Sequence, residues 1–398
     1  MKKAGVRWGL ICFLTYLSAY LCRVNFSAAL SGLSVARGLD YELLGTAGAA
    51  FFAVYAVGQL INGFLGDHLH PVRFVLLALL GTALCNIGVA FARSFFAIFL
   101  LWASNGYFQS IFWSILIRLL SMVTDEKGRS GASALMSCAM PSGYLISWCV
   151  LAPCFEGRNV LLYFLVPAFA ALPMMLLWVN KSALLPKGHT HPLRSGSLSY
   201  DFLHTLGILR REGILLLPAT LICHGLIKEG VAFWIPTVIR GAADSSRVVF
   251  AALALLPLAN YAGTFAAKWL LNRWENTPFR VIRASVFLTV PACFLCFIPK
   301  GVLILLPMCL ISCLGCCANT VLVSYLPMRY GGDDAVSSLV GLFDFCSYVG
   351  AALSTYVLGG MISDRGVHGM AMLWIAAAVC ECLLLVAMAL KEKKRALS

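Results

Sequence analysis

Two basic residues of this sequence stand inside apolar stretches, where an ionised side chain is costly. Arg7 begins the first stretch, and Arg23 follows it after a long apolar run. Arg211 begins the second stretch, and Lys228 follows it in the same way. With a rise of ~1.5 Å per residue, both lie roughly 24–26 Å along their predicted helices. A charge at that depth costs at least ~2.5–3.5 kcal/mol and usually faces a cavity or a partner. Two such cations suit an anion, because the guanidinium fork matches the oxygens of phosphate or carboxylate.

A histidine and two carboxylates accompany these cations. His224 precedes Lys228 by one helical turn, so both occupy one helical face, and His224 either binds or titrates with the anion or is a packed, hydrogen-bonded residue. Asp344 lies midway along a later apolar stretch, where it either pairs with Lys228 or carries a proton. Glu229 is about 100° around the helix from Lys228 and need not share its face. The alternative is that the carboxylates neutralise Lys228 or Arg23 and leave no net anion site.

The elements that position these residues must lie in lipid. The chain has 398 residues, of which 61% are hydrophobic and 12% charged, whereas a soluble domain carries about 25% charged residues. This composition excludes a water-soluble globule and a disordered chain. A helix needs about 20 apolar residues to cross a bilayer. The sequence therefore predicts an all-α integral membrane protein with twelve spans: 8–31, 43–65, 73–92, 95–119, 131–153, 159–180, 213–239, 247–271, 280–299, 301–326, 336–360 and 368–390.

A longer polar connection divides the predicted spans into two pseudo-symmetric halves of six. Residues 1–180 form the first six-helix bundle, 181–211 a cytoplasmic linker rich in Pro, Gly and Ser, and 212–398 the second bundle. Within the linker, Leu203–Leu209 is expected to form a short interfacial helix. Each half places one cation at a matching position. Duplicated halves with a site at their interface are typical of secondary transporters.

The net charge of +13 agrees with this topology. Most Lys and Arg residues fall in loops on one side of the predicted membrane, which the positive-inside rule assigns to the cytoplasm. We expect a multi-pass protein of the inner (cytoplasmic) cell membrane with both termini in the cytoplasm and an uncleaved first helix. No motif suggests a nucleic-acid partner.

The remaining chemistry-bearing residues predict no enzyme and no cofactor. Nearly all 16 cysteines lie in apolar runs and are interpreted as packing residues. His189 and His191 in the linker are expected to be solvated, without a metal. The sequence has no phosphate-binding Gly-x-x-x-x-Gly-Lys loop, no His-Glu-x-x-His and no Gly-x-Ser-x-Gly. We therefore expect a monomeric transporter that is driven by solute gradients.

Four segments of the sequence carry family motifs. They are Tyr20-Leu21-Cys22-Arg23-Val24-Asn25-Phe26, then Gly106-Tyr107-Phe108-Gln109 with Trp113 and Arg118, then Trp234-Ile235-Pro236-Thr237, and Gly341-Leu342-Phe343. Together they resemble the organophosphate:phosphate antiporters of the major facilitator superfamily (MFS), such as the bacterial glycerol-3-phosphate and hexose-phosphate transporters. The resemblance implies the MFS fold. It also implies that Tyr20, Gln109 and Trp113, with Tyr16 and Asn105, line the substrate cavity; hydrogen bonds between helices are the alternative.

The superfamily's loop motif is present between the second and third predicted spans. It reads Gly63-Phe64-Leu65-Gly66-Asp67-His68, with Arg73 following. Its small residue lets helices approach each other, and Asp67 can meet helix ends and basic groups as a gate. The second-half copy, 268–273, lacks the aspartate.

Three positions depart from the family pattern. Lys228 replaces an arginine, Met140 stands where the family has a histidine, and Asp344 stands where it has a glycine. Lysine lacks the planar fork of arginine, so the exchange changes a bidentate site.

We therefore expect a secondary active transporter of a small organic or phosphorylated anion, working by alternating access, with exchange for inorganic phosphate as one mode. Its partners would be an anionic substrate (a phosphate ester, phosphate or a carboxylate) and the lipid bilayer. One alternative is proton-coupled symport of a carboxylate such as a sugar acid, although Cys22 stands where those relatives carry an acid. Another is a membrane sensor that binds a sugar phosphate without transporting it.

Overall fold

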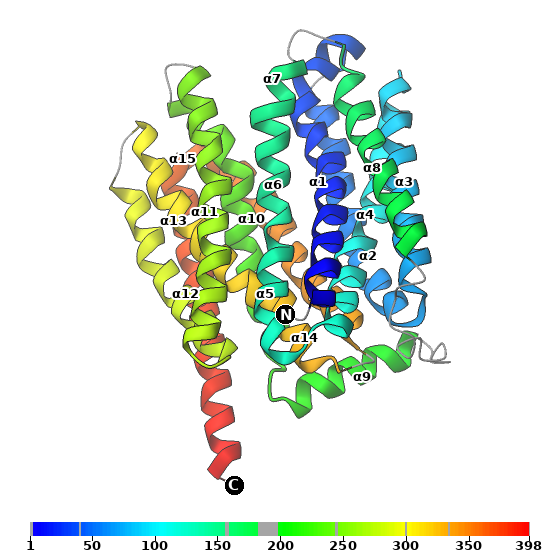
Figure 1. The fold of residues 1–398 in the computed structure, drawn as a ribbon. Helices are drawn as coiled ribbons and strands as arrows, with labels where there is room; N and C mark the ends of the chain where they lie inside the picture. The colour runs from blue at the N-terminus through cyan, green and yellow to red at the C-terminus, as the bar shows by residue number, and fades with distance from the viewer. Residues whose placement is uncertain are drawn as a thin grey trace. The chain divides into compact units, whose positions relative to one another are not determined.

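The computed structural model describes residues 3–39, 41–155, 159–181, 198–242, 246–298, 301–332 and 335–397, and builds them into helices joined by short connections (Figure 1). Ten helical segments of this part are long and apolar enough to cross a membrane. The two other predicted spans coincide with α10 and α11, in which the side chains of residues 233–253 are outside the described set. The all-α membrane fold is thus confirmed. The α-helices are α1 (Lys3–Arg37), α2 (Tyr41–His68), α3 (Pro71–Phe91), α4 (Phe95–Val123), α5 (Glu126–Ser137), α6 (Ala139–Leu145), α7 (Ala152–Phe155), α8 (Leu162–Lys181), α9 (Leu198–Arg211), α10 (Leu217–Ala242), α11 (Ser246–Arg273), α12 (Pro278–Phe294), α13 (Leu305–Asn319), α14 (Leu326–Tyr330) and α15 (Val336–Leu397).

Several helices begin at residues that satisfy or dispense with a free backbone N–H group. Ser94 accepts a hydrogen bond from Ala97 N at 3.3 Å before α4, and Asp125 accepts one from Gly128 N at 2.9 Å before α5. Pro71 and Pro278 occupy the first turns of α3 and α12, where no N–H donor is needed. α15 contains two candidate spans, Val336–Ser354 and His368–Lys391.

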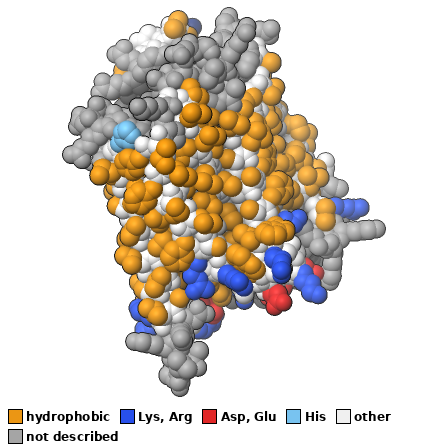
Figure 2. Space-filling model, turned by 90° about the vertical axis from the view of Figure 1, so that its left-hand side faces the viewer, with side chains coloured by type: hydrophobic (Ala, Val, Ile, Leu, Met, Phe, Trp, Pro, Cys, Tyr) orange, Lys and Arg blue, Asp and Glu red, His pale blue; other side chains and the backbone are white. Residues whose placement is uncertain are grey.

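The surface of the molecule has the character expected of a membrane protein. Figure 2 shows one face on which hydrophobic side chains form a broad continuous area, with Lys and Arg side chains gathered near one end of it. Large apolar side chains are well exposed there and elsewhere, among them Leu176 at 66% and Leu383 at 65%. In water such a surface would cause association, whereas lipid tails solvate it.

The chain divides into two compact units. The first comprises Met1–Asp201 and Gly332–Gly341, and the second Phe202–Gly331 and Leu342–Ser398. The predicted boundaries at 180 and 212 remain predictions. The predicted short helix at 203–209 is found as part of the longer α9. Residues 182–197 of the predicted linker, with His189 and His191, lie outside the described residues.

Amide side chains hold the helices of the first unit together. Asn86 on α3 and Asn105 on α4 both donate to the carbonyl oxygen of Cys22 on α1, each at 3.1 Å. Asn25 on α1 donates to Asn86 Oδ1 at 2.7 Å. Because lipid offers no competing partner, buried polar groups must be satisfied within the protein. These bonds therefore fix α1 against its neighbours one turn from Arg23.

In the second unit, α10 packs backbone to backbone against α15. A Cβ atom added to Gly225 would meet the carbonyl oxygen of Ser347, and one added to Gly350 would meet that of Ile222. Glycine is required at such close crossings because any side chain would push the helices apart. The close approach brings the polar residues of α10 to those of α15.

Substitution of Gly225 by Val is expected to destabilise the second unit by about 1–3 kcal/mol, because the new side chain overlaps the backbone of α15. Thermal unfolding of the detergent-purified protein measures this loss. Gly207→Ala is the matched control, since nothing lies within 4 Å of the position of its Cβ in α9. Equal unfolding temperatures for the wild type and Gly225→Val would contradict the tight crossing.

Candidate functional site

Arg23 lies in a cage of aromatic rings in the first unit. Its Cζ atom is 4.3 Å from the ring centroid of Tyr55, 5.3 Å from those of Tyr20 and Phe51, and 5.5 Å from that of Phe52. The ring faces carry partial negative charge and stabilise a cation within about 6 Å. The cage, built by α1 and α2, therefore offsets part of the cost of placing a guanidinium at this depth.

The aromatic cage continues into a second group of rings that includes Trp113. Tyr16 lies 5.0 Å from Tyr20 and 4.9 Å from Trp113, measured between ring centroids. The indole Nε1 of Trp113 is buried and has no hydrogen-bond partner among the described residues. Buried donors are nearly always satisfied, so this N–H is a candidate contact for a bound molecule. Of the predicted cavity residues, Tyr20 contacts Arg23, and Trp113 is connected to Tyr20 through the ring of Tyr16.

Gln109 and Asn105 hold α4 against α1. Gln109 Nε2 donates to the carbonyl oxygen of Ala19 at 2.9 Å, as Asn105 does to that of Cys22. Helix-to-helix hydrogen bonding, the alternative that the sequence left open, accounts for these amides. A direct role of Gln109 in substrate binding remains a prediction.

Lys228 forms an ion pair with its neighbour Glu229 in the second unit. The 100° between the two positions does not keep them apart, because both side chains are long enough to reach around the helix. Gly315 on α13 lies beside the Lys228 stem, since a Cβ there would be in ordinary van der Waals contact with that of Lys228, at 3.5 Å. Asp344 is buried in α15, and its pairing with Lys228 remains a prediction.

His224 is paired with a carboxylate that the sequence interpretation misses. Its Nδ1 atom lies 3.2 Å from Oε1 of Glu381 on α15, and the two side chains are 4% and 1% exposed. Glu381 is a lone acidic residue in the last apolar stretch, which is the same signal that singles out Asp344. Glu381 is therefore a second buried carboxylate of α15, paired with His224.

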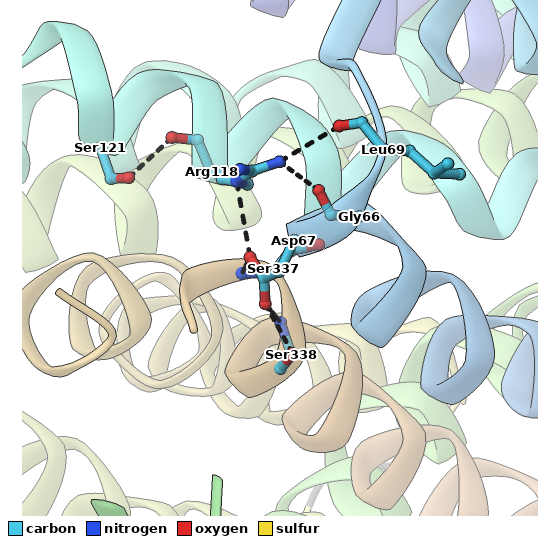
Figure 3. Close-up of polar contacts among 7 residues, drawn as sticks. All are labelled: Gly66, Asp67, Leu69, Arg118, Ser121, Ser337 and Ser338. Carbon is cyan, nitrogen blue, oxygen red and sulfur yellow. Dashed lines mark hydrogen bonds and ion pairs between the residues drawn. The ribbon is translucent and has the colours of Figure 1, made fainter. Parts of the chain in front are cut away.

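Asp67 joins the end of α2 to the start of α15 within the first unit (Figure 3). Its carboxylate accepts hydrogen bonds from the backbone N–H groups of Ser337 at 3.0 Å and Ser338 at 2.7 Å, and from the Ser338 hydroxyl at 2.5 Å. A carboxylate at a helix N-terminus is stabilised by these donors and by the helix dipole. Asp67 thus meets a helix end, as the loop motif predicts.

The basic partner of Asp67 is Arg118 on α4. Arg118 Nε lies 3.5 Å from Asp67 Oδ1, and its Nη1 donates to the carbonyl oxygens of Gly66 and Leu69 (Figure 3). Arg73, which the motif nominates for this role, is exposed on α3. Arg118 holds this loop because its side chain reaches the carbonyl oxygens of Gly66 and Leu69.

The small residue of the motif allows a close helix crossing, as predicted. A Cβ on Gly63 would lie 2.6 Å from the Cα atom of Gly341. In the second-unit copy of the loop, where the aspartate is absent, Arg329 donates to the carbonyl oxygen of Asn276 at 2.6 Å, and Arg280 stacks 4.7 Å from the ring centroid of Trp274. The guanidinium groups of Arg329 and Arg280 therefore contribute to holding this loop.

Comparison with known proteins identifies one family model, the Major Facilitator Superfamily, which matches residues 12–355. The phosphoglycerate transporter protein of Salmonella typhimurium is 23% identical, over 94% of this chain and 86% of its own length. A probable hexose phosphate transport protein of Chlamydia pneumoniae is 30% identical over 109 residues, which are 27% of this chain and 24% of that protein. The membrane sensor protein UhpC of Salmonella typhimurium is 29% identical over 127 residues, 32% of this chain and 29% of that protein. The chain thus aligns with only about a quarter of the length of the hexose phosphate transport proteins.

Solved structures share the fold. The human organic anion transporter MFSD10 (TETRAN) superimposes with a TM-score of 0.77 at 16% identity, covering 96% of this chain and all of that one. FucP, in its outward conformation, gives a TM-score of 0.75 at 14% identity, covering 97% of this chain and 98% of that one.

Replacement of Asp67 by Ala is expected to loosen the first turn of α15. Loss of a capping carboxylate costs about 1–2 kcal/mol, so the amides of Ser337 and Ser338 should exchange hydrogen for deuterium about 5- to 30-fold faster. Mass spectrometry of the 335–341 peptide measures this rate. Asp125→Ala, which removes the cap of α5, is the control and should leave the peptide unchanged. An unaltered rate in Asp67→Ala would show that the contact contributes no stability.

Proposed function

The chain belongs to the Major Facilitator Superfamily, and from this premise we propose that it moves a small phosphorylated or other organic anion across the membrane, with exchange for inorganic phosphate as the reaction. It is a secondary transporter and not an enzyme. The observation that carries the substrate class is the pair of basic side chains inside apolar helices, one in each unit. Arg23 in its aromatic cage and the buried Lys228 would each offer positive charge to an anion within its own unit.

The chemistry of the first-unit site supports a phosphate oxygen as ligand. The guanidinium of Arg23 presents paired N–H donors that match two oxygens of one phosphate group. The unpartnered indole N–H of Trp113 adds a neutral donor. Relatives named for phosphoglycerate and hexose phosphate transport agree with this assignment. Lysine carries its charge without the planar fork of arginine, so Lys228 would attract an anion without fixing its orientation.

The Asp67 contact supplies the proposed gate. Alternating access requires bonds that hold one state and can be broken to reach the other. The bonds of Asp67 to the first turn of α15 are charge-assisted and few, which suits this requirement. We place both termini on the cytoplasmic side of the inner cell membrane, because basic residues dominate the loops on that side.

A membrane sensor is the second candidate function, favoured by the similarity to UhpC. A sensor would bind a sugar phosphate through the same cations. Counterflow in proteoliposomes separates the two functions, since a sensor binds labelled ligand without accumulating it. Proton-coupled uptake of a sugar acid would instead show counterflow with the acid and none with phosphates.

Replacement of Arg23 or Lys228 by Ala is expected to reduce counterflow about 10- to 100-fold, because a charge-assisted hydrogen bond contributes about 1.5–3 kcal/mol. Counterflow is measured with labelled inorganic phosphate, glycerol 3-phosphate, glucose 6-phosphate and 3-phosphoglycerate. Arg23→Lys should retain charge but lose the fork and fall between wild type and Arg23→Ala.

Exposed cations serve as matched controls for these substitutions. Arg93→Ala and Lys127→Ala each remove one positive charge from the surface and should transport as the wild type does. Size-exclusion profiles confirm that each variant is folded. Normal counterflow by Arg23→Ala or Lys228→Ala would refute the proposed binding role.

A further inference from the structure

The pair formed by His224 and Glu381 is buried between two apolar helices of the second unit. Glu381 lies about 15 Å from the Lys391 end of its span, and His224 about 10 Å from the start of α10. Both side chains are nearly inaccessible, and the ring and carboxylate meet at 3.2 Å. An ionisable pair at this depth is costly unless it has a function. Neither residue is required by the anion site described above.

The surroundings of the pair favour a proton over a metal ion as its ligand. Three thiols lie within electrostatic reach of the carboxylate: Cys223 on α10, Cys293 on α12 and Cys382 on α15. In the described part of the chain, no group of three His, Cys, Asp or Glu residues is arranged to hold a metal ion. Thiols are neutral near pH 7, so the charges nearest to the pair along α10 are Lys228 and Glu229, which neutralise each other. Asp344 is a further buried carboxylate of the same unit.

The geometry identifies the atom that receives the proton. In the tautomer that donates from Nδ1 to Glu381, the other ring nitrogen, Nε2, is the basic atom. Nε2 of His224 is buried and lacks a hydrogen-bond partner within the described residues. Without the extra proton the pair carries one negative charge, and with a proton on Nε2 it becomes an imidazolium–carboxylate pair of zero net charge. We propose that His224 and Glu381 form a proton-binding site that couples anion movement to a proton.

The link to the anion follows from the position of His224 on α10. His224 and Lys228 are one turn apart on the same helical face. A proton on His224 therefore raises the positive charge next to Lys228, and an anion bound there raises the affinity for the proton by the same factor. The inference rests on the proposed function, because it assigns the proton to the same translocation cycle.

Neutral substitutions separate coupling from structure. Glu381→Gln keeps the size of the side chain and the acceptor for Nδ1, and it fixes the pair at the zero net charge of the proton-loaded state. The double variant His224→Gln/Glu381→Gln is also neutral and cannot titrate, and it guards against misfolding caused by one unpaired partner. Glu212→Gln removes an exposed carboxylate that pairs with Arg211 and is the matched control.

Proton binding can be observed without any substrate. In protein labelled with ¹³C-histidine, the NMR signal that His224→Gln/Glu381→Gln removes is assigned to His224. We expect this signal to move from its neutral to its protonated position when the wild-type sample is taken from about pH 8 to about pH 5. In Glu381→Gln the His224 signal should stay at its neutral position down to a lower pH than in the wild type, because the carboxylate that stabilises the imidazolium is absent. A signal that is constant over this range would overturn the inference in favour of a fixed structural pair.

Transport then tests coupling in proteoliposomes. With an acidic exterior, the wild type should accumulate labelled inorganic phosphate or one of the three phosphate esters inside the vesicles to a concentration above the external one. Glu381→Gln and the double variant should retain counterflow but lose at least about tenfold of the gradient-driven accumulation, and Glu212→Gln should lose none. Wild-type counterflow without a response to the gradient would overturn the coupling. Absence of wild-type counterflow with all four probes would contradict the proposed function, while the NMR titration decides the proton site on its own.

Discussion

The cost of a charge in hydrocarbon governs the polar contacts of this structure. No water is available inside the spans, so every ionised group must be stabilised by the protein itself or by a ligand. Arg23 uses the faces of aromatic rings, Lys228 uses Glu229, and Glu381 uses His224. Asp67 uses the first backbone N–H groups of α15 and the guanidinium of Arg118. Each solution fixes the distance between two helices or positions a side chain on its helix.

The same cost explains how such contacts serve transport. A bound anion can replace a neighbouring carboxylate as the counter-charge of Lys228, and a proton can neutralise the pair of His224 and Glu381. Both events change which contacts are stable without creating an uncompensated charge. Under this account substrate, proton and gate compete for a small set of ionic bonds, and helix rearrangement follows from that competition.

The helical architecture and the places of Arg23, Lys228 and Asp67 in their helices follow from sequence, because span length and isolated charges are local signals. The contact partners of the polar residues cannot be predicted in the same way. Arg118 rather than Arg73 supports Asp67, and Gln109 binds the Ala19 carbonyl, because these choices depend on how α2 and α4 pack against their neighbours. Glu381 was detectable as a lone carboxylate in an apolar stretch, but its partner lies on a helix far away in sequence.

The central claim is that the protein binds a phosphate-bearing anion through the basic side chains of its apolar helices, Arg23 and Lys228. Thermal unfolding of the purified protein tests it directly, since a ligand at about 100 times its Kd stabilises the folded state by about 2.7 kcal/mol. The account predicts a higher unfolding temperature with phosphate or a phosphate ester, and no increase with a neutral sugar of the same skeleton. Stabilisation by sugar acids or neutral sugars, with none by any phosphate, would contradict it.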